Sequence, residues 1–168
     1  MTARKGFTLV EILIVVIILG ILAAMIIPQF SSATESARAS MLMDDLRVMR
    51  SQMEVFKAQH QGVPPGFPNC DIAQTPTEAT VLVHITQSST PAGVTAAVGT
   101  VGYPYGPYMK EIPTNPINGK SSILVITGAN PCPNTPSDLY GWIYQPSSMT
   151  FKADCLGTDG DGVPYFNY

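Results

Sequence analysis

The sequence of 168 residues contains few charged residues. Lysine and arginine number 9 and aspartate and glutamate 12, for a net charge of −3, and charged residues are only 12% of the chain, about half the usual quarter. With so few basic residues, a nucleic-acid partner bound through a dense basic face is not expected. Hydrophobic residues reach 45%, which excludes a disordered, highly charged tail protein.

Groups that commonly build catalytic and metal sites are also scarce. The chain has two histidines, His60 and His84, and no C-x-x-C pair among its three cysteines, so a zinc site is not expected. It has no glycine-rich phosphate loop before a helix and no recognisable arrangement of nucleophile, histidine and acid. We therefore expect no enzymatic activity and structural roles for both histidines.

The apolar residues are concentrated near the start of the chain. Residues 12–27 are an unbroken apolar run, and residues 7–28 carry one charge, Glu11. A membrane-spanning helix needs about 20 mainly apolar residues, which predicts a transmembrane helix over residues 7–28. Arg4 and Lys5 precede it, so the N-terminal end is expected in the cytoplasm and the remainder outside it.

Two simpler interpretations of this run leave Glu11 unexplained. A cleaved secretory signal, with a secreted enzyme beginning near residue 25, would need an A-x-A-like cleavage site, which Ala23-Ala24-Met25 does not supply. A plain single-pass anchor has no need of an acid, which costs about 2.5–3.5 kcal/mol near the bilayer centre and less near the edge. Glu11 is therefore expected to pair with another group.

The segment Lys5-Gly6-Phe7-Thr8-Leu9-Val10-Glu11 resembles the processing site of type IV pilin-like precursors. The resemblance implies that residues 1–6 are a leader, that a prepilin peptidase cuts after Gly6, and that the new amine of Phe7 is methylated. It also implies that Glu11 pairs with an N-terminal amine of its own or a neighbouring subunit during assembly. Loss of the leader removes Arg4 and Lys5 and leaves a net side-chain charge of −5.

Gly20 and Pro28 continue the resemblance. Proline kinks or breaks a helix, and glycine lowers helix propensity by about 1 kcal/mol relative to alanine. The resemblance implies that the segment between them unwinds as subunits pack into a filament. The alternative is that both are ordinary residues of a membrane helix.

Residues 29–61 predict an amphipathic continuation of the same helix. Leu42, Leu46, Met49, Met53 and Phe56 follow spacings of four and three residues, the period of a helix packed on one face. Gly62 is a natural terminator. The Met-rich stripe is interpreted as core packing rather than as a promiscuous binding face.

Residues 62–168 predict a small, loop-rich outer domain. Thr75 and Glu78 match a capping box for a short helix ending near Gln87, and residues 88–102 read as a surface loop. Strands are expected at residues 123–127, 140–145 and 150–153. Together with the long helix they predict an α+β, pilin-like fold in which the helix packs on a three-stranded antiparallel sheet.

The segment of residues 106–119, which contains Gly106-Pro107-Tyr108-Met109, Ile112-Pro113 and Asn115-Pro116-Ile117-Asn118-Gly119, resembles the turn-rich segment of major pseudopilins of type II secretion. It lacks the aromatic residue and glycine that commonly follow the Asp/Asn-Pro step. The resemblance implies a homopolymeric filament subunit in the bacterial cytoplasmic membrane, with its C-terminal domain periplasmic or extracellular. Implied partners are the prepilin peptidase, minor pseudopilins and the inner-membrane assembly platform. Alternatives are an extracellular type IV pilus subunit and a membrane-tethered binding module that does not polymerise.

Two further features of the outer domain are ambiguous. Asp159 and Asp161 lie in a glycine-rich turn, and the pseudopilin resemblance implies calcium there, although the full calcium loop is absent; the alternative is a solvated turn. Cys132 and Cys155 bracket the expected hairpin and are the favoured disulfide on the oxidising side of the membrane, which leaves Cys70 over.

Overall fold

The computed structural model describes residues 6–128 and 130–168, without the side chains of residues 26–32. It divides into two compact units, Met1–Ala37 and Arg38–Tyr168. The elements in chain order are α1 (Leu9–Gln59), η1 (Pro68–Cys70), α2 (Glu78–Thr86), β1 (Ser88–Ser89), β2 (Thr95–Ala96), β3 (Ile123–Val125), β4 (Trp142–Gln145), η2 (Pro146–Ser148), β5 (Thr150–Ala153) and η3 (Tyr165–Asn167).

The second unit is built on the part of α1 that follows Ala37. Its predicted stripe is confirmed, because each of its five side chains is at most 1% exposed: Leu42, Leu46, Met49, Met53 and Phe56. His60 extends the stripe and is 0% exposed. The helix ends at Gln59, and the two residues that reverse the chain, Gln61 and Gly62, have φ of 56° and 82°. Glycine adopts that conformation without strain.

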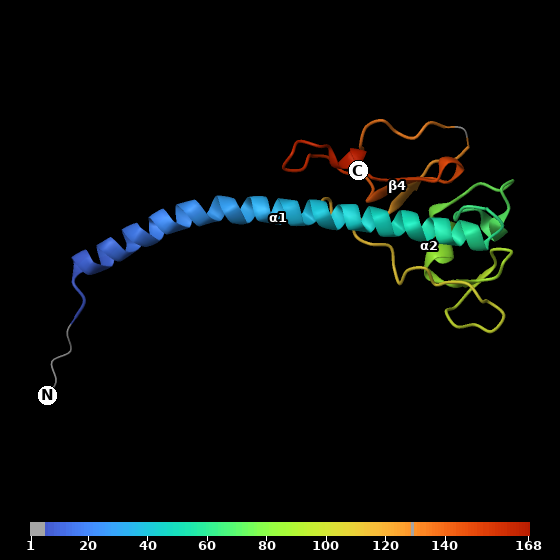
Figure 1. The fold of residues 1–168 in the computed structure, drawn as a ribbon, viewed down its shortest axis with the longest axis horizontal. Coiled ribbons are helices and arrows are strands. Elements are labelled where there is room, and N and C mark those ends of the chain that lie inside the picture. The colour runs from blue at the N-terminus through green and yellow to red at the C-terminus, as the bar shows by residue number, and fades with distance from the viewer. Residues whose placement is uncertain (1–5, 129) are drawn as a thin grey trace. The chain divides into compact units, whose positions relative to one another are not determined.

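The core of this unit joins four elements, α2 and three strands, to α1. Leu42, Leu46, Met49 and Met53 of the stripe pack in one cluster with Val81 and Ile85 of α2 and with Ile123, Trp142 and Phe151 of the three strands β3, β4 and β5. Figure 1 shows α2 and β4 on this part of the helix. The fold is α+β, as the sequence predicts.

The three-stranded sheet is mixed rather than antiparallel, so that part of the prediction is wrong. Its order is β3-β4-β5, with β3 parallel and β5 antiparallel to the central β4. The predicted β4–β5 hairpin is confirmed, and Met149 closes its turn with a φ of 54°. Residues 126–141 connect β3 to β4, which is long enough to return the chain to the start of β3 and so permits parallel pairing.

Two local predictions in the outer unit are also wrong. The N-cap of α2 is Thr77, whose hydroxyl oxygen accepts from the Thr80 N–H at 3.2 Å, and not Thr75. Residues 88–102 are not simply a surface loop, because β1 and β2 pair antiparallel within them. Ser89 is fully buried and exchanges two backbone hydrogen bonds with Tyr105, at 2.8 and 3.1 Å. Its polar groups tolerate burial because they are partnered.

The turn-rich segment of residues 106–119 fastens the sheet to the loop before β4. The Asn115 amide donates to the Gly141 carbonyl at 2.9 Å, and the Trp142 indole N–H donates to the Pro113 carbonyl at 2.9 Å. The Asn118 amide donates to the carbonyls of Tyr140 and Asp154. These hydrogen bonds hold the segment of residues 106–119 against the start of the central strand β4.

Candidate assembly and processing site

The predicted processing residues lie just before α1 begins. Gly6 and Phe7 have irregular backbone and are exposed, and the Phe7 ring is 83% exposed. The rest of the predicted leader, residues 1–5, lies outside the described residues. The predicted peptidase and methylation positions are thus accessible in the described chain.

Thr8 and Glu11 form a reciprocal cap at the start of α1. The Thr8 backbone N–H and hydroxyl donate to Glu11 Oε2 at 2.7 and 2.8 Å, and the Glu11 N–H donates to the Thr8 hydroxyl oxygen at 3.2 Å. This is the geometry of a capping box, which satisfies N–H groups that the first turn of a helix leaves unpaired. The negative carboxylate also lies at the positive end of the helix dipole.

The role of Thr8 is the functional feature that sequence reasoning missed. The prediction assigned Glu11 only to an N-terminal amine. The signal was present, because Thr8 and Glu11 match the pattern of a threonine followed three residues later by glutamate. The structure therefore gives Glu11 an internal partner before any pairing between subunits.

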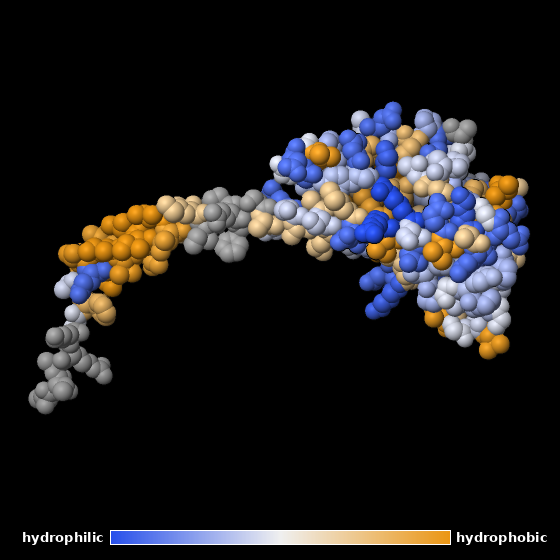
Figure 2. Space-filling model, viewed as in Figure 1, coloured by the Kyte–Doolittle hydropathy of each residue, from blue (hydrophilic) through white to orange (hydrophobic). Residues whose placement is uncertain are grey.

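Behind this cap, α1 presents a continuous apolar surface. Its large apolar side chains from Leu9 to Met25 are 49–81% exposed, and Figure 2 shows them as a nearly unbroken orange band on the visible face. An exposed apolar patch of this size marks contact with a membrane or another protein. Of the helices in the described residues, none combines the length and apolarity of a membrane span.

The other two predicted assembly residues lie within α1. A methyl group added at Gly20 would have no atom within 4 Å, so packing in the described chain does not demand glycine there. Pro28 belongs to residues 26–32, whose side chains lie outside the described part. The unwinding of the segment between them stays a prediction.

The predicted calcium residues do not fit calcium. Asp159 Oδ1 accepts from the N–H groups of Asp161 and Val163, both at 2.9 Å, and Oδ2 accepts from the Tyr168 hydroxyl. These hydrogen bonds, with that from Tyr168 the strongest, lower the pKa of Asp159. Donors thus point at both oxygens, whereas calcium needs six to eight oxygen ligands. Nowhere in residues 6–128 and 130–168 do three acidic, histidine or cysteine side chains gather around one point.

The loop before β4 is organised by a different acid, Asp154, which is fully buried. Its carboxylate accepts from the Ser137 N–H and hydroxyl at 2.6 and 2.5 Å and from the N–H groups of Asp138 and Tyr140 at 3.2 and 3.1 Å. Burial alone would raise the pKa of Asp154, but these four hydrogen bonds together outweigh it and lower the pKa. The loop is therefore closed by N–H and O–H donors around a carboxylate.

The predicted disulfide between Cys132 and Cys155 is not present, because both residues and Cys70 are free thiols. Cys155 follows β5 and is buried in the core, 1% exposed, whereas Cys132 lies half-buried in the loop before β4 and is not part of that core. Burial raises the pKa of the Cys155 thiol. The side chains thus occupy different environments.

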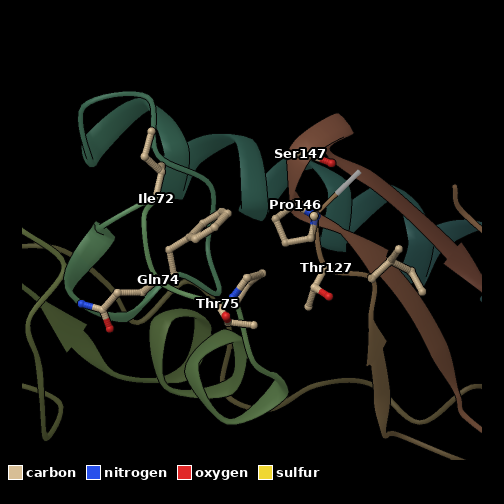
Figure 3. Close-up of a pocket in the computed structure, with 10 residues that line it drawn as sticks. Ile72, Gln74, Thr75, Thr127, Pro146 and Ser147 are labelled. Carbon is tan, nitrogen blue, oxygen red and sulfur yellow. The ribbon is translucent and has the colours of Figure 1, made fainter. Parts of the chain in front are cut away.

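A groove lies on the surface of the second unit. It has a volume of about 470 Å³ and runs between Ile72, Gln74 and Thr75 on one side and Thr127 and Pro146 on the other (Figure 3). None of its ten described lining residues carries an acidic or basic side chain. The groove is therefore lined by apolar and uncharged polar side chains.

Comparisons with known proteins agree with the geometry of the N-terminal segment. The family model of the prokaryotic N-terminal methylation motif matches residues 1–27. The type II secretion system core protein G of Dickeya chrysanthemi is 24% identical over 172 residues, which cover 96% of this chain and 97% of that protein. No solved structure matches the chain significantly.

Two shorter similarities have higher identity. The type II secretion system core protein G of Pseudomonas aeruginosa is 36% identical over 61 residues, 36% of this chain, and the match spans only 43% of that protein. The type IV major fimbrial protein FimA of Dichelobacter nodosus is 45% identical over 51 residues, 30% of this chain and 33% of that protein. The chain is thus similar to proteins named for secretion and for fimbriae.

Proposed function

We propose that the chain, which carries the prokaryotic N-terminal methylation motif and is similar over nearly its whole length to a type II secretion system core protein G, is the major pseudopilin of a type II secretion system. In this role it is a structural filament subunit rather than an enzyme. The observation that carries the proposal is the Thr8–Glu11 cap at the head of an exposed apolar helix, directly after Gly6 and Phe7. The similarity that spans nearly the whole of a core protein G favours secretion over other pilin-like roles.

The proposed sequence of events begins in the bacterial cytoplasmic membrane. The apolar segment anchors the precursor, a prepilin peptidase cuts between Gly6 and Phe7, and the Phe7 amine is methylated. The new ammonium group is four residues before Glu11 in the sequence, next to an apolar segment where an unpaired charge is costly. Exchange of the Thr8 donors for this amine, in the same or a neighbouring subunit, would fix the axial register of the filament, much as a buried polar residue sets register in a coiled coil.

The subunit is proposed to contact copies of itself, minor pseudopilins and the inner-membrane assembly platform, with its second unit periplasmic. Intact-mass measurement and N-terminal sequencing of the chain expressed with a prepilin peptidase test the first step. We expect a chain that starts at N-methyl-Phe7. A start near residue 25, or an unprocessed Met1, would overturn the proposal.

The assembly step is tested by quantifying cross-linked filaments from cells that express Glu11→Gln or Glu11→Val. Gln keeps an acceptor for Thr8 but removes the charge, so both variants are expected to lose filaments if the charge pairs with an amine. Val48→Ala, a change at an exposed position farther along α1, serves as the control for expression and insertion. Undiminished filament yield in both Glu11 variants would favour a tethered module that does not polymerise.

A type IV pilus subunit is the second candidate, favoured by the similarity to FimA. Deletion of the gene separates the two roles. A secretion pseudopilin predicts that exported proteins accumulate inside the cells while surface fibres are unaffected. Loss of long surface fibres with normal protein export would assign the chain to a pilus instead.

A further inference from the structure

The two histidines of the chain are stacked on one phenylalanine inside the second unit. The Phe56 ring lies 3.8 Å from the His60 ring and 4.7 Å from the His84 ring, measured between centroids, with interplanar angles of 12° and 22°. His60 and His84 are 0% and 1% exposed. The stack joins the end of α1 to α2, and it carries no charge as long as both imidazole rings are neutral.

The hydrogen bonds fix which ring nitrogens carry a proton. His60 Nδ1 lies 2.8 Å from the Phe56 carbonyl oxygen, which only accepts, so Nδ1 bears the hydrogen and Nε2, 3.0 Å from the Ser89 hydroxyl, is free to accept. His84 Nδ1 instead accepts from the Gly66 N–H at 3.2 Å. A second proton on His84 would therefore face the Gly66 N–H and break that bond, whereas the Ser89 hydroxyl can rotate to accept from a protonated His60.

No acid around the stack offsets a positive charge. The titratable groups that face it are Tyr105 and Tyr108, from the segment after β2, and Cys70 of η1 acts on Tyr108. Besides Ser89 and Gly66, backbone groups of Thr90 and Gly93 also interact with the two rings. Among the described residues, no carboxylate contacts either ring. A charge in such a site is costly unless it is paired.

A route for the proton is present. A surface groove between η1, α2 and β2 is lined by Pro68, Thr80, Val83, His84 and Gly93, so solvent approaches the edge of the buried ring. Burial, and after it the charge of His60, lowers the pKa of His84 to about 4, and burial also lowers the pKa of His60. The neutral ring is thus the form that the folded chain requires.

We propose that His84 is an acid-sensitive latch, whose protonation releases α2 and the β1–β2 hairpin from the end of α1 while the β3–β4–β5 sheet stays folded. In the unfolded chain His84 takes up its proton near the ordinary histidine pKa of about 6.5. The folded pKa of His84 is lower than this unfolded value. The stabilisation by the neutral ring is therefore complete above about pH 6.5 and is lost as the pH falls toward about 4. This inference does not depend on the proposed role in secretion.

Hydrogen exchange of the full chain in detergent micelles, measured by mass spectrometry and corrected for the intrinsic pH dependence, tests the latch. Between pH 6.5 and 4.5, we expect the amides of Val63, Gly66 and residues 78–96 to lose protection at least about tenfold. Amides of β4 and β5 should keep theirs. Equal loss of protection in the sheet, or none in α2, would overturn the proposal.

Two matched variants assign the effect. His84→Asn places an amide oxygen where Nδ1 accepts from Gly66 and cannot titrate, so the acid response should disappear. His60→Gln keeps an acceptor for Ser89 and leaves His84 in place, so the response should remain. An unchanged acid response in His84→Asn would contradict the latch.

Should the Asn variant fail to fold, the unmodified chain still decides. It has only two histidines, so imidazole NMR signals give both titration curves without ambiguity. One ring should titrate well below pH 6.5, together with the amide signal of Gly66. Ordinary titration of both rings in the folded chain would overturn the proposal.

Discussion

The carboxylate of Glu78 accepts a hydrogen bond from the backbone N–H of Ile123 at 2.7 Å. This bond joins the first residue of α2 to β3, the strand at one edge of the three-stranded sheet. An edge strand presents unpaired backbone groups that invite pairing with another chain. Glu78 covers one of them from within the same unit.

Replacement of Glu78 by alanine is expected to lower the free energy of unfolding by about 1–2 kcal/mol, because the Ile123 N–H loses a charged acceptor. Glu78→Gln keeps an oxygen in place and should lose less than half as much. Urea unfolding followed by the fluorescence of Trp142, the sole tryptophan, measures both. No loss in either variant would show that the hydrogen bond contributes nothing measurable.

Gly141 is expected to tolerate no side chain. A methyl group there would collide with the backbone carbonyl oxygen and carbon of Lys120, whereas one on Gly160 would meet no atom within 4 Å. Gly141→Ala should therefore destabilise the unit by about 2–3 kcal/mol through overpacking, and Gly160→Ala should change little. The same urea experiment compares them, and a Gly160 variant as unstable as the Gly141 variant would contradict this account.

Asp154→Asn is expected to lower the free energy of unfolding by about 2–3 kcal/mol at neutral pH, because an amide nitrogen would face N–H donors in a buried site. The pKa of Asp154 is lowered in the folded chain, so its contribution is complete above the unfolded value of about 3.9 and is lost as the pH falls below it. Unfolding curves of the two proteins should converge at low pH. A difference between the two proteins that does not shrink as the pH falls would rule out the carboxylate charge as its source.

Calcium is expected to leave the thermal unfolding midpoint of the chain unchanged. Both oxygens of Asp159 already accept hydrogen bonds from the backbone and from Tyr168. Differential scanning calorimetry with millimolar calcium, and separately with EDTA, gives the comparison, and magnesium controls for ionic strength. A saturable rise in the midpoint with calcium alone would restore the metal site that the turn residues first indicated.

Thr8→Val is expected to fray the start of α1, because it removes the hydroxyl that both donates to Glu11 and accepts from its N–H. Thr8→Ser keeps that hydroxyl and should behave like the unmodified chain. Amide exchange of Glu11 in detergent micelles should be several-fold faster in the valine variant. Identical exchange rates in the two variants would show that the Thr8 hydroxyl does not stabilise the start of α1.

The sequence predicted best what depends on local periodicity. The stripe from Leu42 to Phe56 repeats at the helical period, and burial of every member follows from packing one face. Strand direction was not predictable in this way, because residues 126–141 carry no periodic signal and only tertiary pairing sets β3 parallel to β4.

Capping shows the same limit at the level of two residues. Thr8-x-x-Glu11 and Thr75-x-x-Glu78 have the same pattern, but only the first forms a capping box. Glu78 instead bonds to Ile123, 45 residues away in sequence. Local sequence cannot reveal a competing partner that the fold brings close, and for the same reason the stack of His60 and His84 on Phe56 was not foreseen.

The order β3-β4-β5 also determines when each strand can pair while the chain is being synthesised. β4 and β5 are joined by a short turn and can pair as soon as both are synthesised, whereas β3 emerges earlier and must wait for β4 across residues 126–141. Closing that longer loop costs more entropy and slows pairing. Until β4 and β5 are made, the apolar stripe of α1 and the backbone edge of β3 stay uncovered. The chain can therefore pair wrongly with other chains until its last strands are synthesised.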